Sequence, residues 1–177
     1  LHCKFILPNP VSDGIVFIYS NWIKSGILPL VLALEQNGYG KYDGKKVLKS
    51  KTEPISYEGK YLSEYDDKKD FIQGKYMVIA GSGENLVGKL EEELRVVASP
   101  ENVDGSKIKI VIGSTVASEG LDFKNIRSIH ILEPWHNINK IEQVIGRGIR
   151  NCSHKELEPK ERNVTVYLHS SKVDEIE

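Results

Sequence analysis

The chain of 177 residues is long enough for one domain with a substantial core, and its 40% apolar and 28% charged content is ordinary for a globular fold. No apolar run approaches the roughly 18–20 residues of a membrane-spanning helix, so we expect no membrane partner. The net charge of −1 excludes a strongly basic protein, and 2 cysteines are too few for a disulfide framework or a four-ligand zinc site. We therefore expect an intracellular protein with reduced thiols and no metal site, in which nucleic-acid binding would need a local patch or a partner domain.

Short runs of β-branched and apolar residues alternate along the chain with segments of helical periodicity. The runs are continuous, which is typical of strands buried on both faces. In chain order the pattern first predicts a strand at 14–20, a helix at 21–40 that ends at Gly38 or Gly40, and a polar insertion at 41–74. A strand at 75–81 and a helix at 85–99 follow, and then strands at 107–114 and 128–134. The last predicted elements are a helix at 137–150 and a strand at 163–169. Strands joined by such crossovers make an α/β fold with a mostly parallel sheet covered on both faces.

The predicted insertion at 41–74 is rich in Lys, Tyr, Asp and Glu and has little periodicity. We expect it to lie on the surface, with one short helix around Tyr61–Phe71. The first residue is Leu1 rather than Met, so we expect residues 1–177 to be a single domain, insertion included, taken from a longer protein.

Polar residues gather where the predicted strands end. Ligands of parallel α/β sheets bind beyond the carboxyl ends of the strands, so this clustering predicts the functional edge. The residues concerned are Ser20, Asn21, Gly81, Ser82, Gly113, Ser114, Thr115 and Glu133.

The segment Gly83–Leu90 nearly matches the phosphate-binding loop G-x-x-x-x-G-K-[ST] and follows a predicted strand. However, Leu90 stands where a hydroxyl must bind Mg²⁺, and Leu86 and Leu90 fit the buried stripe of a helix. The sequence therefore favours an amphipathic helix over a self-sufficient P-loop nucleotidase.

Two segments together carry the main functional signal: "GSTVASEGLDF" (Gly113–Phe123) after a strand, and "QVIGRGIR" (Gln143–Arg150) on a helix. With them the chain, over roughly 14–169, resembles the C-terminal RecA-like domain of superfamily-two helicases and translocases. Ser114, Thr115, Gly120 and Asp122 match motif V of that family, while Gln143, Gly146, Arg147 and Arg150 match Q-x-x-G-R-x-x-R of motif VI. The segment Val16–Asn21 suits motif IV, and Gly81-Ser82 suits the nucleic-acid-contacting loop that follows it. The resemblance implies a RecA-like three-layer sandwich whose mostly parallel sheet has about five or six strands.

Within that family, three stretches resemble the helicase-like transcription factors and nucleoside triphosphatases of poxviruses and other large cytoplasmic DNA viruses. They are "EGLDFKNIRSIHILEPWHN", "GRGIRNCSH" and "ERNVTVYLH". This resemblance implies an ATP-dependent helicase or nucleoside triphosphatase of a virion or a host cytoplasm, with viral transcription machinery as a possible partner.

The residue types in the second segment suit phosphoryl transfer. Arginine brings a permanent charge and a planar fork of donors that matches phosphate oxygens, and residues three apart on a helix lie on one face. We expect Arg147 and Arg150 to be the catalytic arginine fingers toward ATP, with Gly146 and Gly148 leaving room for a neighbouring domain. The resemblance implies that Gln143, Gly120, Asp122 and Gly146 belong to the ATP-binding region. The alternative is that the two arginines form surface ion pairs with Glu119, Asp122 or Glu133.

Short donors at the strand ends suit the phosphates of DNA or RNA without reading sequence. We expect nucleic-acid contacts from Ser20, Asn21, Ser82, Ser114 and Thr115. Helix capping is the alternative role for Ser20 and Asn21. Similarly, Trp135 could either stack on a base or pack in the core.

The resemblance implies that the Walker lysine and the Mg²⁺-binding acid lie on an N-terminal RecA-like domain, and this chain has neither. ATP and Mg²⁺ would therefore be bound mainly by that partner domain of the same protein. We expect the isolated chain to have negligible ATP hydrolysis and at best weak nucleic-acid binding. From another class, the chain could be a non-catalytic protein-docking module of a viral transcription or packaging complex, with 41–74 as its contact surface.

Overall fold

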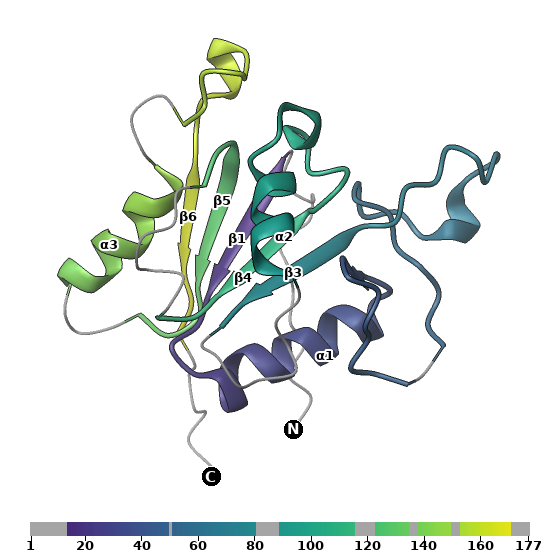
Figure 1. Ribbon diagram of the computed structural model, residues 1–177, viewed down its shortest axis with the longest axis horizontal. Coiled ribbons are helices and arrows are strands. Elements are labelled where there is room, and N and C mark those ends of the chain that lie inside the picture. The colour runs from purple at the N-terminus through teal and green to yellow at the C-terminus, as the bar shows by residue number, and fades with distance from the viewer. Residues whose placement is uncertain are drawn as a thin grey trace, which may run out of the picture.

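The fold is described from a computed structural model, which places residues 14–49, 51–80, 89–115, 123–134, 138–149 and 153–170. Within these ranges, six parallel strands form one sheet in the order β2-β3-β4-β1-β5-β6 (Figure 1). The strands are β1 (Ile15–Tyr19), β2 (Gly40–Lys41), β3 (Lys75–Ile79), β4 (Ile110–Gly113), β5 (Ile126–Ile131) and β6 (Thr165–Leu168). The α-helices are α1 (Leu28–Gln36), α2 (Leu90–Val97) and α3 (Ile138–Gly148).

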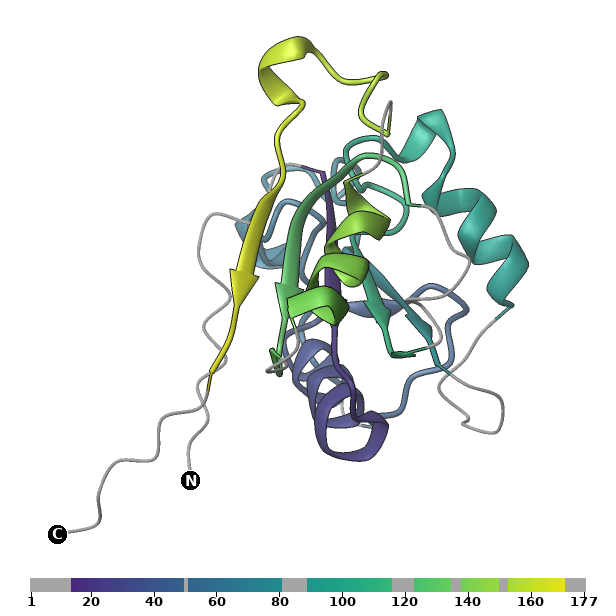
Figure 2. The same ribbon diagram turned by 90° about the vertical axis from the view of Figure 1, so that its left-hand side faces the viewer.

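Helices cover both faces of this sheet (Figure 2). The α1 helix packs on the face that carries Val16 and Ile18, whereas α2 and α3 pack on the opposite face with Phe17 and Ile129. All of β1 is buried because this strand lies between β4 and β5, which accounts for its continuous apolar sequence. The predicted α/β fold with a mostly parallel sheet is confirmed.

The connection from β1 to α1 starts with a π-helix, Ile23–Ile27, rather than with a regular α-helix. The N–H of Ile27 donates to the carbonyl of Trp22 at 2.9 Å, a bond that spans five residues. The helical segment ends before Gly38, one of the two glycines predicted to stop it. Gly38 has a φ of +93°, and a Cβ there would overlap the carbonyl oxygen of Glu53, so this position requires glycine.

The segment 41–74 is fastened to the sheet. Its first residue, Lys41, belongs to β2 and pairs with Tyr76, so the polar segment begins one residue later than predicted. Isolated bridges join Ile55 to Tyr61 and Ser56 to Gln73. The short helix expected around Tyr61–Phe71 is a 3₁₀-helix at Leu62–Glu64. The segment projects beyond β2 at one side of the molecule (Figure 1).

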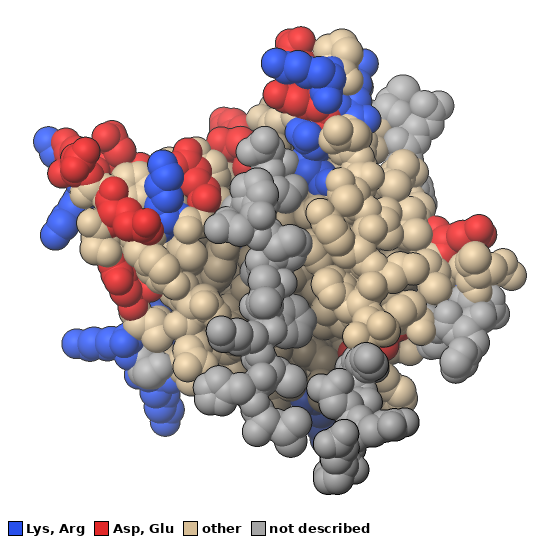
Figure 3. All heavy atoms as spheres, turned by 180° about the vertical axis from the view of Figure 1, so that it is seen from behind, with Lys and Arg blue, Asp and Glu red and all other residues tan. Residues whose placement is uncertain are grey.

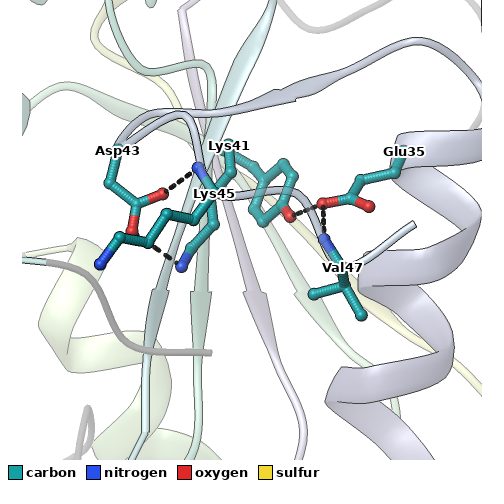
Figure 4. Close-up of polar contacts among 6 residues, drawn as sticks. Glu35, Lys41, Asp43, Lys45 and Val47 are labelled. Atoms are coloured by element: carbon teal, nitrogen blue, oxygen red, sulfur yellow. Dashed lines mark hydrogen bonds and ion pairs between the residues drawn. The ribbon is translucent and has the colours of Figure 1, made fainter. Parts of the chain in front are cut away.

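A buried carboxylate, that of Glu35, joins α1 to the segment 41–74 and to β3 (Figure 4). It accepts hydrogen bonds from the backbone N–H groups of Val47 at 2.9 Å and Leu48 at 2.5 Å. It also accepts a bond of 2.6 Å from the hydroxyl of Tyr76. Burial, and then the hydrogen bond to Glu35, raises the pKa of Tyr76, so this hydroxyl stays protonated and keeps donating.

A second buried charged group lies beside β2. The ammonium of Lys41 is 3.0 Å from a carboxylate oxygen of Asp43, and Asp43 also accepts the backbone N–H of Lys45 at 3.0 Å (Figure 4). Burial raises the pKa of Glu93 on α2, Asp43 raises it further, and Lys41 lowers it. Lys41 on β2 and Glu93 on α2 are therefore both buried and close enough for the charge of one to affect the other.

Candidate functional site

The carboxyl ends of the strands meet at one edge of the sheet, as the sequence predicted (Figure 2). Backbone hydrogen bonds continue past the last paired residues and align the segments that follow. The N–H of Ser20 donates to Gly113 at 3.1 Å, that of Ser114 to Ile79 at 3.0 Å, and that of Leu132 to Tyr19 at 3.0 Å. The segments after β1, β4 and β5 are therefore held in register at this edge.

Glu133 organises the segment after β1. Its carboxylate accepts the hydroxyl of Ser20 at 2.9 and 3.1 Å, and the backbone N–H of Asn21 at 3.1 Å. The Ser20 oxygen in turn accepts the N–H of Trp22 at 3.2 Å. Ser20 is fully buried, and its one hydroxyl hydrogen cannot serve both Glu133 and a phosphate. In this conformation Ser20 positions the turn after β1, but it is not a helix cap, because the helical segment has Trp22 at its N-cap and no side-chain capping bond.

Gly26 makes the contact between Ser20 and Glu133 possible. A Cβ at this position would overlap the Ser20 hydroxyl and would lie 3.0 Å from a Glu133 oxygen. We therefore expect Gly26→Ala to displace the serine and to destabilise the fold by about 1–3 kcal/mol, the usual cost of overpacking.

This expectation can be checked by hydrogen–deuterium exchange of the peptides that contain Ser20 to Ile27, which should become less protected. Gly44→Ala is the control for glycine replacement in open space, because a Cβ there would meet nothing within 4 Å, although its φ of +78° adds local strain. Unchanged protection in Gly26→Ala would contradict the contact.

Asn21 and Thr115 form the more accessible part of the edge. Thr115 is exposed and Asn21 is half-buried. The Thr115 hydroxyl donates to Oδ1 of Asn21 at 3.5 Å, and the Tyr19 hydroxyl reaches the same oxygen at 3.4 Å. Burial is the main cause that raises the pKa of Tyr19, so its hydroxyl stays a donor. Ser114, by contrast, is buried at the end of β4.

The α3 helix brings together the described residues of the predicted ATP-binding segment. Ile141 and Val144 are buried against the sheet, while Gln143 is exposed and Arg147 half-buried. Gln143 and Arg147 are four residues apart and therefore share one side of the helix. A Cβ at Gly146 would meet nothing within 4 Å, so this part of α3 borders open space.

Gly148 does not have the predicted role of leaving room for another domain. It is buried, and a Cβ there would lie 2.8 Å from the Cδ1 of Ile129 and 3.4 Å from Ile126. The glycine therefore lets α3 lie directly against β5. The prediction failed because the sequence does not show which face of the helix meets the sheet at this position.

A backbone hydrogen bond connects the two segments that carry the helicase resemblance. The N–H of Phe123, the last residue of the first segment, donates to the carbonyl of Arg147 at 3.3 Å. The Phe123 ring is buried against Phe17 of β1, with ring centroids 5.0 Å apart. The backbone of Arg147 is thereby tied to the centre of the sheet.

The alternative role of the two arginines was a surface ion pair with Glu119, Asp122 or Glu133. Among the described residues, no ion pair includes Arg147, and Glu133 is bound by Ser20 and Asn21 instead. Several predicted residues lie outside the described ranges: Ser82, Glu119, Gly120, Asp122, Trp135, Arg150 and most of the P-loop-like segment Gly83–Leu90. The described part of that segment has Lys89 before α2, which starts at Leu90.

In the described ranges, no group of three or more His, Cys, Asp and Glu residues is arranged to hold a metal ion. No helix in these ranges is long and apolar enough to cross a membrane.

His130 and His169 form a pair whose ring nitrogens lie 3.0 Å apart. Burial, and then His169, lowers the pKa of His130 to about 4. At neutral pH His130 is therefore uncharged, as a hydrogen bond between two imidazoles requires.

Sequence reasoning missed two features of this edge. The bond between Glu133 and Ser20 joins residues 113 positions apart, and nothing local to either residue indicates it. The exposed Trp22 follows Asn21 directly. Trp22 stands just after a predicted strand, where functional residues are expected. The sequence analysis did not single it out, because the helical periodicity of the next residues assigned it to a helix.

Comparison with known proteins agrees with this fold and these motifs. Residues 65–152 match the family model of the helicase conserved C-terminal domain. The solved structure of the C-terminal part of the Fun30 ATPase domain superposes with a TM-score of 0.50 at 14% identity, covering 88% of this chain and 34% of that one. At this identity the likeness shows the fold alone, and it confirms the predicted RecA-like architecture.

Three relatives are similar over most of the chain. A provisionally named ATP-dependent RNA helicase of Acanthamoeba polyphaga mimivirus is 35% identical over 156 residues, 81% of this chain and 14% of that protein. An early transcription factor large subunit homolog of African swine fever virus is 32% identical over 166 residues, 89% of this chain and 14% of that protein. An uncharacterised killer-plasmid helicase of Kluyveromyces lactis is 30% identical over 167 residues, 94% of this chain and 23% of that protein.

The chain thus spans 14% of the length of the two viral relatives. The predicted likeness to helicase-like proteins of large DNA viruses, transcription factors among them, is confirmed by these similarities. The matched model, the fold and the relatives agree on one conclusion: the chain belongs to the helicases, of which it contains the conserved C-terminal domain.

Proposed function

We propose that this chain is the second motor domain of an ATP-dependent nucleic-acid helicase or translocase. Arg147 and Arg150 would act as arginine fingers toward ATP and Mg²⁺ that an N-terminal RecA-like domain of the same protein holds. Gln143, Gly146, Gly120 and Asp122 would complete the ATP-binding side of the interface. On this proposal residues 1–177 are one domain of a longer protein, and the isolated chain is inactive.

The observation that carries the proposal is the exposure pattern of α3. Ile141, Val144 and Gly148 are buried against the sheet, while Gln143 is exposed, Arg147 is half-buried, and Gly146 borders open space. A guanidinium presented in this way can meet a phosphate held by a second domain without rearrangement of its own fold.

The nucleic-acid side of the proposal rests on the accessible donors at the sheet edge. Asn21, through its amide N–H, would contact the phosphates directly, as would Thr115 on giving up its 3.5 Å bond to Asn21, together with Ser82. Ser20 and Ser114, which are buried, would hold the backbone of the two segments in position. Closure of the two domains around ATP, and their release after hydrolysis, would shift this grip along the strand.

On the face seen in Figure 3, Lys and Arg side chains lie intermixed with Asp and Glu, both around the segment 41–74 and at the top of the molecule, and they form no separate basic patch on the described surface of this face. We therefore base the proposed phosphate contacts on the hydrogen-bond donors of the sheet edge. Viral transcription machinery as a further partner is proposed from the African swine fever virus relative alone.

The grip can be tested by nucleic-acid-stimulated ATPase assays on the full-length protein, with single-stranded DNA and RNA in separate series. We expect Thr115→Ala and Asn21→Ala each to raise the half-saturating nucleic-acid concentration about fivefold, since one hydrogen bond contributes about 1 kcal/mol. Thr165→Ala, the same change at the exposed opposite end of β6, is the matched control. If neither edge variant differs from this control, the proposed nucleic-acid edge is wrong.

A further inference from the structure

Among the described residues, Trp22 is the largest apolar side chain exposed at the proposed nucleic-acid edge, with an exposed fraction of 59%. It lies between Asn21, one of the proposed phosphate contacts, and the π-helix that leads to α1. Most tryptophans in a folded domain are largely buried, so a position this open calls for a ligand or a partner.

The backbone of Trp22 is fixed on both sides. Its N–H donates to the Ser20 oxygen at 3.2 Å, and its carbonyl accepts the N–H groups of Gly26 at 3.1 Å and Ile27 at 2.9 Å. The Ser20 hydroxyl is in turn held by Glu133. The ring therefore projects from a rigid turn, and binding a ligand on it would cost little conformational entropy.

The surroundings of Trp22 favour a nucleobase over a protein surface. Asn21 precedes it, the exposed Lys24 and Ser25 follow it, and the intervening Ile23 packs against the core. A protein-docking hot spot is usually surrounded by further apolar contacts. An exposed ring with an amide residue before it and a lysine two positions after it instead has the residue types with which proteins hold single strands without reading sequence.

On the basis of the proposed function, we propose that Trp22 stacks on a base of the single strand held at this edge, while Asn21 and Thr115 contact the adjacent phosphates. The stack would be insensitive to base identity, because every base offers an aromatic face. It would give this edge a preference for unpaired over paired nucleic acid, since the faces of paired bases are covered by their neighbours.

The test is equilibrium binding of fluorescently labelled oligonucleotides to the full-length protein. One oligonucleotide is an ordinary single strand, and the second has the same length with abasic sites. We expect Trp22→Ala to weaken binding of the ordinary strand about 10-fold and Trp22→Phe to weaken it about threefold or less, within the range for base–aromatic stacking. The abasic strand should bind the unaltered protein about as weakly as it binds Trp22→Ala. Tyr61→Ala, which removes an exposed aromatic ring from the segment 41–74, is the matched control.

The remaining outcomes separate the two proposals. If Trp22→Ala binds both oligonucleotides like the unaltered protein while Asn21→Ala weakens both, stacking is wrong and the phosphate grip stands. If Trp22→Ala weakens both oligonucleotides equally, the ring does not contact a base. If the unaltered protein binds neither oligonucleotide, the proposed function itself fails.

Discussion

Arg147→Ala in the full-length protein is expected to lower ATP turnover at saturating ATP about 10³- to 10⁵-fold, the range measured for arginine fingers. The physical reason is that negative charge spreads over the γ-phosphate oxygens in the transition state, and a guanidinium meets it with fixed charge and a planar pair of donors. Arg147→Lys should keep the charge but lose the forked geometry, so most of the defect should remain. The KM for ATP should change much less than kcat, because the contact strengthens in the transition state.

The control for the loss of a surface arginine is Arg95→Ala in the last turn of α2, an exposed residue away from the proposed ATP interface. Both variants should give the same circular dichroism spectrum as the unaltered protein. If Arg147→Ala retained turnover within threefold of the Arg95→Ala control, the arginine would have no catalytic role. The non-catalytic docking module would then be the better description of this chain.

The second large effect is expected at Glu35, away from the carboxyl ends of the strands. Glu35→Ala removes the acceptor of Val47, Leu48 and Tyr76 at once, and leaves the buried hydroxyl of Tyr76 without this partner. Leaving the buried Tyr76 hydroxyl without its acceptor costs about 1–3 kcal/mol, and the loss of the two backbone hydrogen bonds to a charged acceptor adds to this cost. The segment after β2 should therefore detach locally from α1.

Hydrogen–deuterium exchange can measure this in the full-length protein, where unfolding of several domains would not be two-state. A local loss of about 3 kcal/mol corresponds to roughly 100-fold faster exchange at the amides of Val47 and Leu48. Tyr76→Phe should produce a smaller effect, about 1 kcal/mol, because it removes one bond of the three. Gln36→Ala, the next and exposed position of α1, should leave the exchange unchanged. Equal exchange in Glu35→Ala and Gln36→Ala would contradict the anchoring role.

The sequence predicted those parts of the fold whose signal is local. β1 was visible because all five of its residues are buried, and α3 because Ile141 and Val144 recur at helical spacing. The strand order and β2 were not visible. β2 has two residues, Gly40 and Lys41, and Lys41 is a buried lysine that no apolar pattern would place in a sheet.

The site was predictable as a location and less so as a set of roles. Ser20, Asn21 and Thr115 do lie together at one edge, because the ends of parallel strands must meet there. Which of these residues positions the backbone and which is accessible depends on the contact of Ser20 with Glu133 and on the lack of space at Gly26. Both are properties of the packed structure. The contacts assigned to ATP and to nucleic acid remain predictions.

The close packing of α3 against β5 at Gly148 limits how far Arg147 can move. The carbonyl of Arg147 accepts a hydrogen bond from Phe123, and its helix is packed closely against the sheet. A shift of the helix alone therefore cannot move the guanidinium far. If Arg147 is the arginine finger that we propose, its approach to a phosphate would then require movement of the entire domain. Variants that alter the chain between this domain and the proposed N-terminal domain should therefore change the turnover rate without any change inside the domain itself.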